Sequence, residues 1–95
     1  MTRGQKSRCR QIAERYGRKN QEAQAISELT ELQYVLTRRP DQRQIDWKND
    51  LIDEMADVLI MIEQLRALYG VDDDEMTERV NFKLNRQIER IKNGG

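Results

Sequence analysis

The sequence predicts an all-α protein, a small helical bundle in which a short N-terminal helix precedes three longer helices. Apolar residues recur three and four positions apart along most of the chain, and no segment shows the alternation of apolar and polar residues that is typical of a strand. Glycine and proline fall where this pattern breaks. The 95 residues fit a single domain, residues 1–95. Because so small a domain has a thin core, we expect a homodimer or homotetramer that buries more surface.

The first two helices are expected on either side of Gly17. Residues 1–15 form a basic arm or short helix, and the helical pattern there extends from about Lys6 to Tyr16. Glycine at the C′ position should end this helix. The second helix should run from about Gln21 to Thr37. Its apolar residues, which we expect in the core, are Ala25, Ile26, Leu29, Leu32, Val35 and Leu36.

The third helix follows a polar loop from Arg38 to Asp46 that contains the only proline, Pro40. This loop is short enough to join two antiparallel helices. Asp46 suits an N-cap position, and Gly70 should end the helix that runs from Trp47 to Tyr69. Apolar residues cover more than one face of this helix, which indicates that neighbours enclose it on several sides. Its main apolar row consists of Leu51, Met55, Val58, Ile62 and Leu65.

The last helix is predicted to begin at a capping box. Asp72 and Glu75 have the spacing of this motif, with aspartate in place of the more usual serine or threonine. The helix should extend from Asp73 to about Lys92, and residues 93–95 should fray. Its expected core positions are Met76, Val80, Leu84, Ile88 and Ile91.

Charge and composition exclude several classes of site. The 17 basic and 17 acidic residues balance overall, although basic residues dominate the first 20 positions. The chain has no histidine, which excludes imidazole-based triads and zinc sites that contain histidine. Cys9 is the only cysteine and cannot form an internal disulfide. Because no signal-peptide pattern or membrane-spanning run is found, we expect a cytoplasmic protein that contacts no membrane.

Two pairs of carboxylates are the candidate functional residues. Asp57 lies within the apolar run of the third helix, where an unpaired polar group costs roughly 2–7 kcal/mol and an ionised one more. Glu54 precedes it by three residues, and Glu28 and Glu31 have the same spacing on the second helix. Residues three apart point the same way on a helix, so the pairs can converge if these helices pack antiparallel. Oxygen-rich sites of this kind suit Mg²⁺ or Mn²⁺.

A simpler interpretation treats these residues as surface glutamates and one aspartate at a packing defect. It applies best to Glu28 and Glu31, because glutamates three apart are common on solvated helices. It explains Asp57 less well, because Arg66 lies more than two turns away and cannot neutralise it. The matched spacing on two neighbouring helices favours the metal site.

The same carboxylates carry a resemblance to a known family. Glu28-x-x-Glu31, an interval and Glu54-x-x-Asp57 resemble the E-E-x-x-E … E-x-x-D signature of the MazG-like all-α nucleoside triphosphate pyrophosphohydrolases, in their short single-domain form, which are relatives of the dimeric dUTPases. Ser27 stands where the signature has its first glutamate. The resemblance covers about Tyr16 to Ile91. The other matching residues are Tyr16-Gly17, Gln21, Ala25, Leu29, Leu32, Asp53, Met55-Ala56, Val58 and the basic segment from Lys83 to Arg90.

The resemblance implies an enzyme that uses Mg²⁺, or Mn²⁺, to cleave a nucleoside triphosphate into the monophosphate and pyrophosphate in the control of nucleotide pools. It implies that four carboxylates are the catalytic residues and metal ligands, namely Glu28, Glu31, Glu54 and Asp57. It also implies a contact between Gln21 and the base. The sequence leaves open which carboxylate is the general base and which base or sugar is preferred.

Two further features bear on function. Lys83, Arg86 and Arg90 form a basic stripe on the last helix that can bind triphosphate oxygens or remain a solvated face. Trp47 can stack on a base or serve packing. The alternative function is a catalytically degenerate module that binds nucleotide, as Ser27 suggests, or a helical module that binds protein or nucleic acid through its basic N-terminus. The zero net charge and the lack of an aromatic or glycine-rich recognition element argue against nucleic acid.

Overall fold

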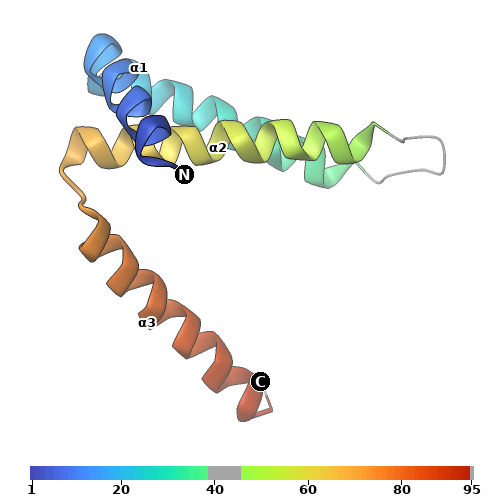
Figure 1. The fold of residues 1–95 in the computed structure, drawn as a ribbon. Helices are drawn as coiled ribbons and strands as arrows, with labels where there is room; N and C mark the ends of the chain where they lie inside the picture. Colours follow the sequence, from blue (N-terminus) through green and yellow to red (C-terminus); the bar gives the residue numbers. More distant parts are fainter. Residues whose placement is uncertain (39–45, 95) are drawn as a thin grey trace.

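The computed structural model describes residues 1–38 and 46–94, which form three helices: α1 (Arg3–Thr37), α2 (Trp47–Tyr69) and α3 (Asp73–Lys92) (Figure 1). No strand occurs in these two ranges, so the prediction of an all-α protein is confirmed. The bounds of α2 and α3 agree with the predicted ones. The prediction for the loop around Pro40 lies outside the described residues.

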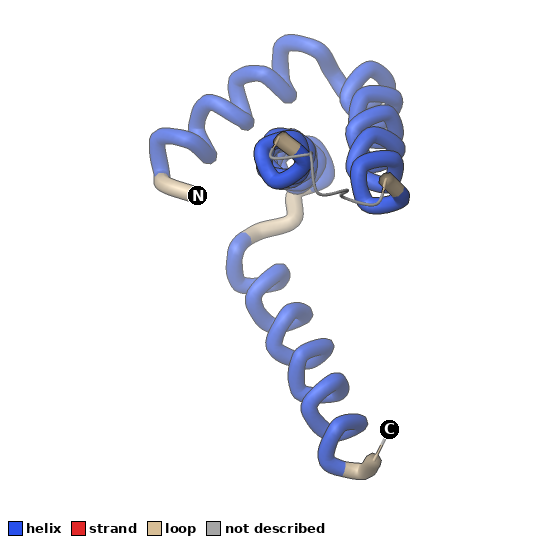
Figure 2. Tube along the Cα trace, turned by 90° about the vertical axis from the view of Figure 1, so that its right-hand side faces the viewer, coloured by secondary structure: helices blue, strands red, loops and turns tan. Residues whose placement is uncertain are grey.

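Gly17 interrupts α1. Its φ of 81° and ψ of 169° are not helical, and this region of positive φ with extended ψ is essentially accessible to glycine alone. Residues 3–16 therefore fold back across the C-terminal half of α2, as Figures 1 and 2 show, while residues 18–37 continue toward the loop. The structure has three helices where four were predicted, because the break is one residue long. Gly17 also differs from the predicted C′ glycine, since its ψ lies far from the left-handed helical value.

The helix ends show which capping predictions hold. Gly70 adopts the left-handed conformation, with φ 65° and ψ 32°, and ends α2 as expected. Asp72 accepts a hydrogen bond from the Glu75 amide, and Glu75 accepts one from the Asp72 amide, which confirms the capping box. Asp46 occupies the N-cap position of α2, but its side chain caps no amide. A capping box at Thr2 and Gln5 starts α1 before the predicted Lys6.

The core lies between α1 and α2, which pack side by side and antiparallel (Figure 1). Small residues let the two helices approach, since Ala13 and Ala25 are among the buried apolar side chains. Trp47 ties the helices together near the loop, because its indole N–H donates to the Val35 carbonyl at 3.0 Å. The remaining buried side chains include two carboxamides; the full set is Cys9, Ala13, Gln21, Ala25, Val35, Met61 and Gln64.

Helix α3 packs against neither α1 nor α2 and extends away from them (Figure 2). Its start is held by ion pairs, in which Asp73 accepts from Arg66 at 2.6 Å and from Lys6 at 3.1 Å. These two hydrogen bonds lower the pKa of Asp73. The bundle predicted for the last helix is therefore not formed within one chain.

Many apolar side chains predicted in the core are exposed in the single chain. Helical periodicity identifies a face that is suited to burial, but it does not identify the element that buries it. Of the predicted core residues, those at least one-third exposed are Ile26, Leu29, Leu36, Met55, Ile62, Val80, Leu84, Ile88 and Ile91. None of the helices over residues 3–37, 47–69 and 73–92 combines the length and the apolar character needed to cross a membrane.

Candidate functional site

Three carboxylates converge between α1 and α2. Glu28 on α1 and Glu54 and Asp57 on α2 each offer an oxygen, and these oxygens all lie within 4.8 Å of one another. The antiparallel packing of the two helices brings the pairs together, as the sequence predicted. None of the ion pairs between described residues involves these three side chains. One oxygen of Glu54, Oε2, is buried without a hydrogen-bond partner.

Burial and mutual repulsion raise the pKa of two carboxylates in this cluster. Burial and the negative charge of Glu28 raise the pKa of Asp57 above its usual range. The pKa of Glu54 is raised first by burial and then by the charges of Asp57, Glu31 and Glu28, with Asp53 the weakest. Both shifts mean that the ionised forms are disfavoured when the cluster holds only carboxylates. A divalent cation coordinated by these oxygens would reverse the repulsion, and hard oxygen donors of this type fit Mg²⁺ or Mn²⁺.

Glu31, the fourth predicted ligand, occupies a different position from the other three. It is exposed, and its oxygens are not part of the group within 4.8 Å. Its charge nevertheless raises the pKa of Glu54, so it lies close to the cluster. Glu31 therefore lies beside the cluster, outside the group of oxygens within 4.8 Å.

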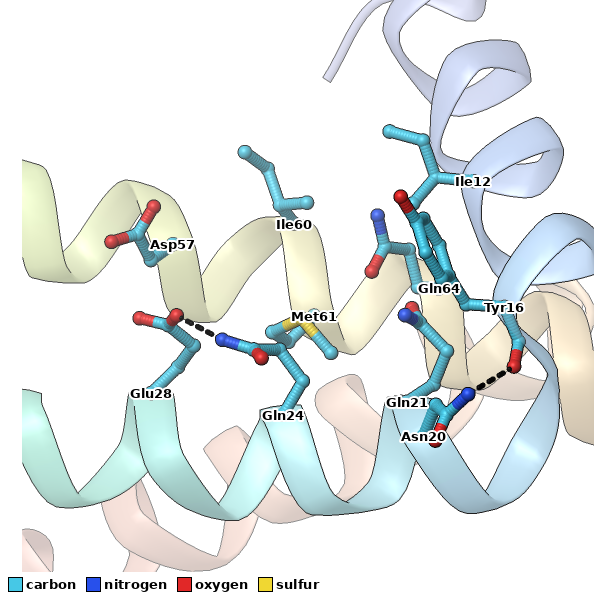
Figure 3. A pocket seen from close by; sticks show the side chains of 10 residues that line it. All are labelled: Ile12, Tyr16, Asn20, Gln21, Gln24, Glu28, Asp57, Ile60, Met61 and Gln64. Carbon is cyan, nitrogen blue, oxygen red and sulfur yellow. Dashed lines mark hydrogen bonds between the residues drawn. The ribbon is translucent and has the colours of Figure 1, made fainter.

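A groove of about 410 Å³ begins at Glu28 and Asp57 and runs along the α1–α2 interface to Tyr16 (Figure 3). Gln24 donates to the Glu28 carboxylate at 2.7 Å, which orients this carboxylate toward the groove. Gln21, for which the resemblance implies a contact with the base, lines the groove and is almost fully buried. The complete lining is Ile12, Tyr16, Asn20, Gln21, Gln24, Glu28, Asp57, Ile60, Met61 and Gln64.

Sequence reasoning missed Gln64, which is 2% exposed and lines the same groove. A glutamine near the charged end of a helix is usually a solvated residue. The available signal was its spacing of seven residues from Asp57, which is close to two helical turns and places both on one face.

The predicted basic stripe and the tryptophan lie away from this groove. Lys83, Arg86 and Arg90 line depressions on the surface of α3, and α3 does not pack against the helices that carry the carboxylates. Trp47, at the start of α2, uses its indole N–H to bond Val35.

Comparison with known proteins adds no relative, because no protein-family model, curated protein or solved structure matches the chain.

Proposed function

We propose that this protein is a Mg²⁺-dependent nucleoside triphosphate pyrophosphohydrolase that acts on nucleotide pools in the cytoplasm. The observation that carries the proposal is the convergence of Glu28, Glu54 and Asp57 oxygens within 4.8 Å, with no ion pair to a basic residue in ranges 1–38 and 46–94. A cluster of this composition suits a hard divalent cation, and such cations are commonly completed by substrate phosphates. The resemblance of the same residues to the MazG-like signature supports this substrate class.

In the proposed reaction, three of the carboxylates are metal ligands and the fourth is the general base. Glu28, Glu54 and Asp57 would hold Mg²⁺, which when bound would neutralise phosphate charge and lower the pKa of an attacking water. Glu31, which is exposed beside the cluster, accepts the proton of that water. Water adds at the α-phosphorus, the bond from this phosphorus to the α–β bridging oxygen breaks, and pyrophosphate leaves with the electron pair. The products are the nucleoside monophosphate and pyrophosphate.

The proposal extends to a homodimer or homotetramer. The apolar row of α3, with Leu84 at 52% and Ile91 at 70% exposure, has no cover within the described part of the chain. Covering such a row favours self-association, because it removes apolar surface from water. Lys83, Arg86 and Arg90 lie on the same helix, and in this proposal they reach the triphosphate in the assembled protein.

The test is a panel of nucleoside triphosphates incubated with Mg²⁺ and assayed for pyrophosphate. Wild type should release pyrophosphate, and EDTA or Glu54→Gln should abolish it. Release of orthophosphate instead, or no product with any triphosphate, would contradict the proposal. A gel shift titrated with salt tests the alternative of a nucleic-acid-binding module, since such binding weakens steeply as salt rises.

A further inference from the structure

The single chain exposes far more surface than a folded monomer of its mass. Its accessible surface is 8044 Å² at a mass of 11.3 kDa, whereas monomeric proteins of that mass expose about 5,700 Å². The excess is therefore about 2,300 Å². A standard protein interface takes about 800 Å² from each partner, and the interfaces of obligate homodimers take more. The chain has enough uncovered surface for an interface of the obligate kind.

One side of the α1–α2 pair carries the groove, and the opposite side is apolar. Groove residues come one position before residues buried between the helices, as Gln24 comes before Ala25 in α1. In α2, Ile60 comes before the buried Met61 in the same way. One residue turns a helix by about 100°, so the positions just after the buried ones share the side away from the groove. We call these side chains the α1–α2 apolar face; they are Ile26, Leu29, Leu36, Ile52, Met55, Leu59 and Ile62.

The α1–α2 apolar face has the spacing of a helical bundle interface. Its members lie three and four apart from Ile52 to Ile62 in α2, and the same spacing runs from Ile26 to Leu36 in α1, where Gln33 is the one polar side chain. Side chains at this spacing interdigitate with those of facing helices. None of these eight positions is charged, although 36% of the residues in the chain are. The seven apolar members expose 43% to 66% of their surface, so no described residue covers the face.

The direction of α3 agrees with a partner on this side. The groove is lined by Ile12 and Tyr16, so residues 3–16 lie on the groove side of the pair. Figure 2 shows that α3 extends away from the pair on the side opposite to residues 3–16, which is the side of the α1–α2 apolar face. A molecule docked on that face would therefore also lie beside α3 and could cover part of its apolar row. The face and α3 together account for the size of the excess surface.

We infer that the α1–α2 apolar face binds the same face of a second copy of this chain. The face is two helices wide, and the matching surface with that width and uncharged character is the face itself, which a two-fold axis places against its equal. Such an interface consists of four helices and leaves the groove open on the outer side of each copy. The inference rests on the self-association in the proposed function and adds the surface that carries it. It does not rest on hydrolysis.

Sedimentation equilibrium of the full chain tests the interface. Wild type should associate into an even number of 11.3 kDa chains. Leu59→Glu should dissociate to half that mass at concentrations about 100-fold higher than wild type does, because the interface then buries two carboxylates without partners. Tyr34→Glu is the matched control, since Tyr34 is 60% exposed at the position before the buried Val35, on the groove side. This variant should associate as wild type does.

Thiol labelling measures the same face without an added charge. Leu59→Cys and Tyr34→Cys are each made in a chain that also carries Cys9→Ala, and both are treated with iodoacetamide. In the associated protein the thiol of Leu59→Cys should react about tenfold more slowly than that of Tyr34→Cys, because the reagent reaches it only when the copies separate. Dilution to the concentration at which the copies dissociate should remove the difference.

Three results would overturn the inference. A wild-type protein that sediments as one chain at every concentration would reject both this interface and the proposed self-association. Equal labelling of the two cysteine variants would reject this interface alone. So would dissociation in Ile91→Glu, on the apolar row of α3, together with wild-type association in Leu59→Glu, because α3 would then hold the copies together. None of these readouts uses turnover, so a protein that releases no pyrophosphate would contradict the proposed hydrolysis and leave the interface intact.

Discussion

Asp57→Asn should stabilise the protein without metal and remove its response to metal. The substitution keeps the shape of the side chain but deletes one charge of the cluster. Asp57 and Glu28 offer oxygens within 4.8 Å of each other. Two unit charges at that separation repel by ~0.9 kcal/mol in the dielectric of water, the appropriate limit for partly exposed side chains. For a domain of this size that gain corresponds to a rise in melting temperature of ~4–7 °C.

Magnesium should reverse the order of the melting temperatures of wild type and Asp57→Asn. A ligand at 100 times its dissociation constant stabilises the folded state by ~2.7 kcal/mol, so wild type should gain stability on titration with Mg²⁺. Asp57→Asn lacks a charged ligand oxygen and should show little gain. The assay is thermal unfolding followed by circular dichroism, in EDTA and across a Mg²⁺ titration. Added sodium chloride should reduce the advantage of the variant in EDTA, because salt screens the repulsion between exposed charges.

Asp53→Asn provides the matched control. Asp53 is exposed on the same helix and contributes least to the raised pKa of Glu54, so its removal should change the melting temperature less and preserve the Mg²⁺ response. If wild type and Asp57→Asn shift equally with Mg²⁺, or if Asp57→Asn is destabilised in EDTA, the cluster is not a cation site.

Four further predictions test separate parts of the molecule. Gly17→Ala should lower the free energy of unfolding by ~1–3 kcal/mol in a urea titration, because φ of 81° with extended ψ strains any side chain even where open space surrounds it. Burial, followed by the charge of Glu63, raises the pKa of Cys9, so iodoacetamide should label the native thiol far more slowly than the unfolded one at pH 8. The same shift should lower the free energy of unfolding as the pH rises above the thiol pKa of the unfolded state, because the unfolded state then loses its proton first. In Cys9→Ala the free energy of unfolding should stay constant above pH 8, which would identify the Cys9 thiol as the cause. Arg90→Glu should raise KM more than it lowers kcat if the arginine binds ground and transition states equally, and unchanged kinetics would exclude a substrate contact. Glu31→Gln should lower kcat and leave the thermal response to Mg²⁺ intact, whereas loss of that response would make Glu31 a metal ligand instead of the base.

Local signals in the sequence predicted the elements well, because their causes are local. The capping box at Asp72 and the left-handed Gly70 fix the ends of α2 and α3 through contacts within a few residues. Gly17 was recognised as a boundary, but the direction of the chain beyond it was not, since a positive φ is compatible with several values of ψ.

Tertiary arrangement was predicted only where spacing determines it. The spacing of three residues within each carboxylate pair, on two antiparallel helices, correctly predicted that Glu28, Glu54 and Asp57 lie close together. The apolar row of α3 was predicted to lie in a core, but it is exposed, and no neighbour covers it among the described residues. Gln64 was missed because its spacing from Asp57 indicates only a shared helix face, and whether that face is buried at Gln64 depends on the packing of the opposite helix.

The identity of the reaction products tests the proposed function most directly. Wild-type protein is incubated with Mg²⁺ and each of the four ribonucleoside triphosphates, and phosphorus-31 NMR follows the products. Cleavage at the α–β bridge predicts equal amounts of nucleoside monophosphate and pyrophosphate, both lost in EDTA and in Glu54→Gln. Nucleoside diphosphate with orthophosphate, or products that persist in Glu54→Gln, would contradict the assignment of this cluster as a pyrophosphohydrolase site.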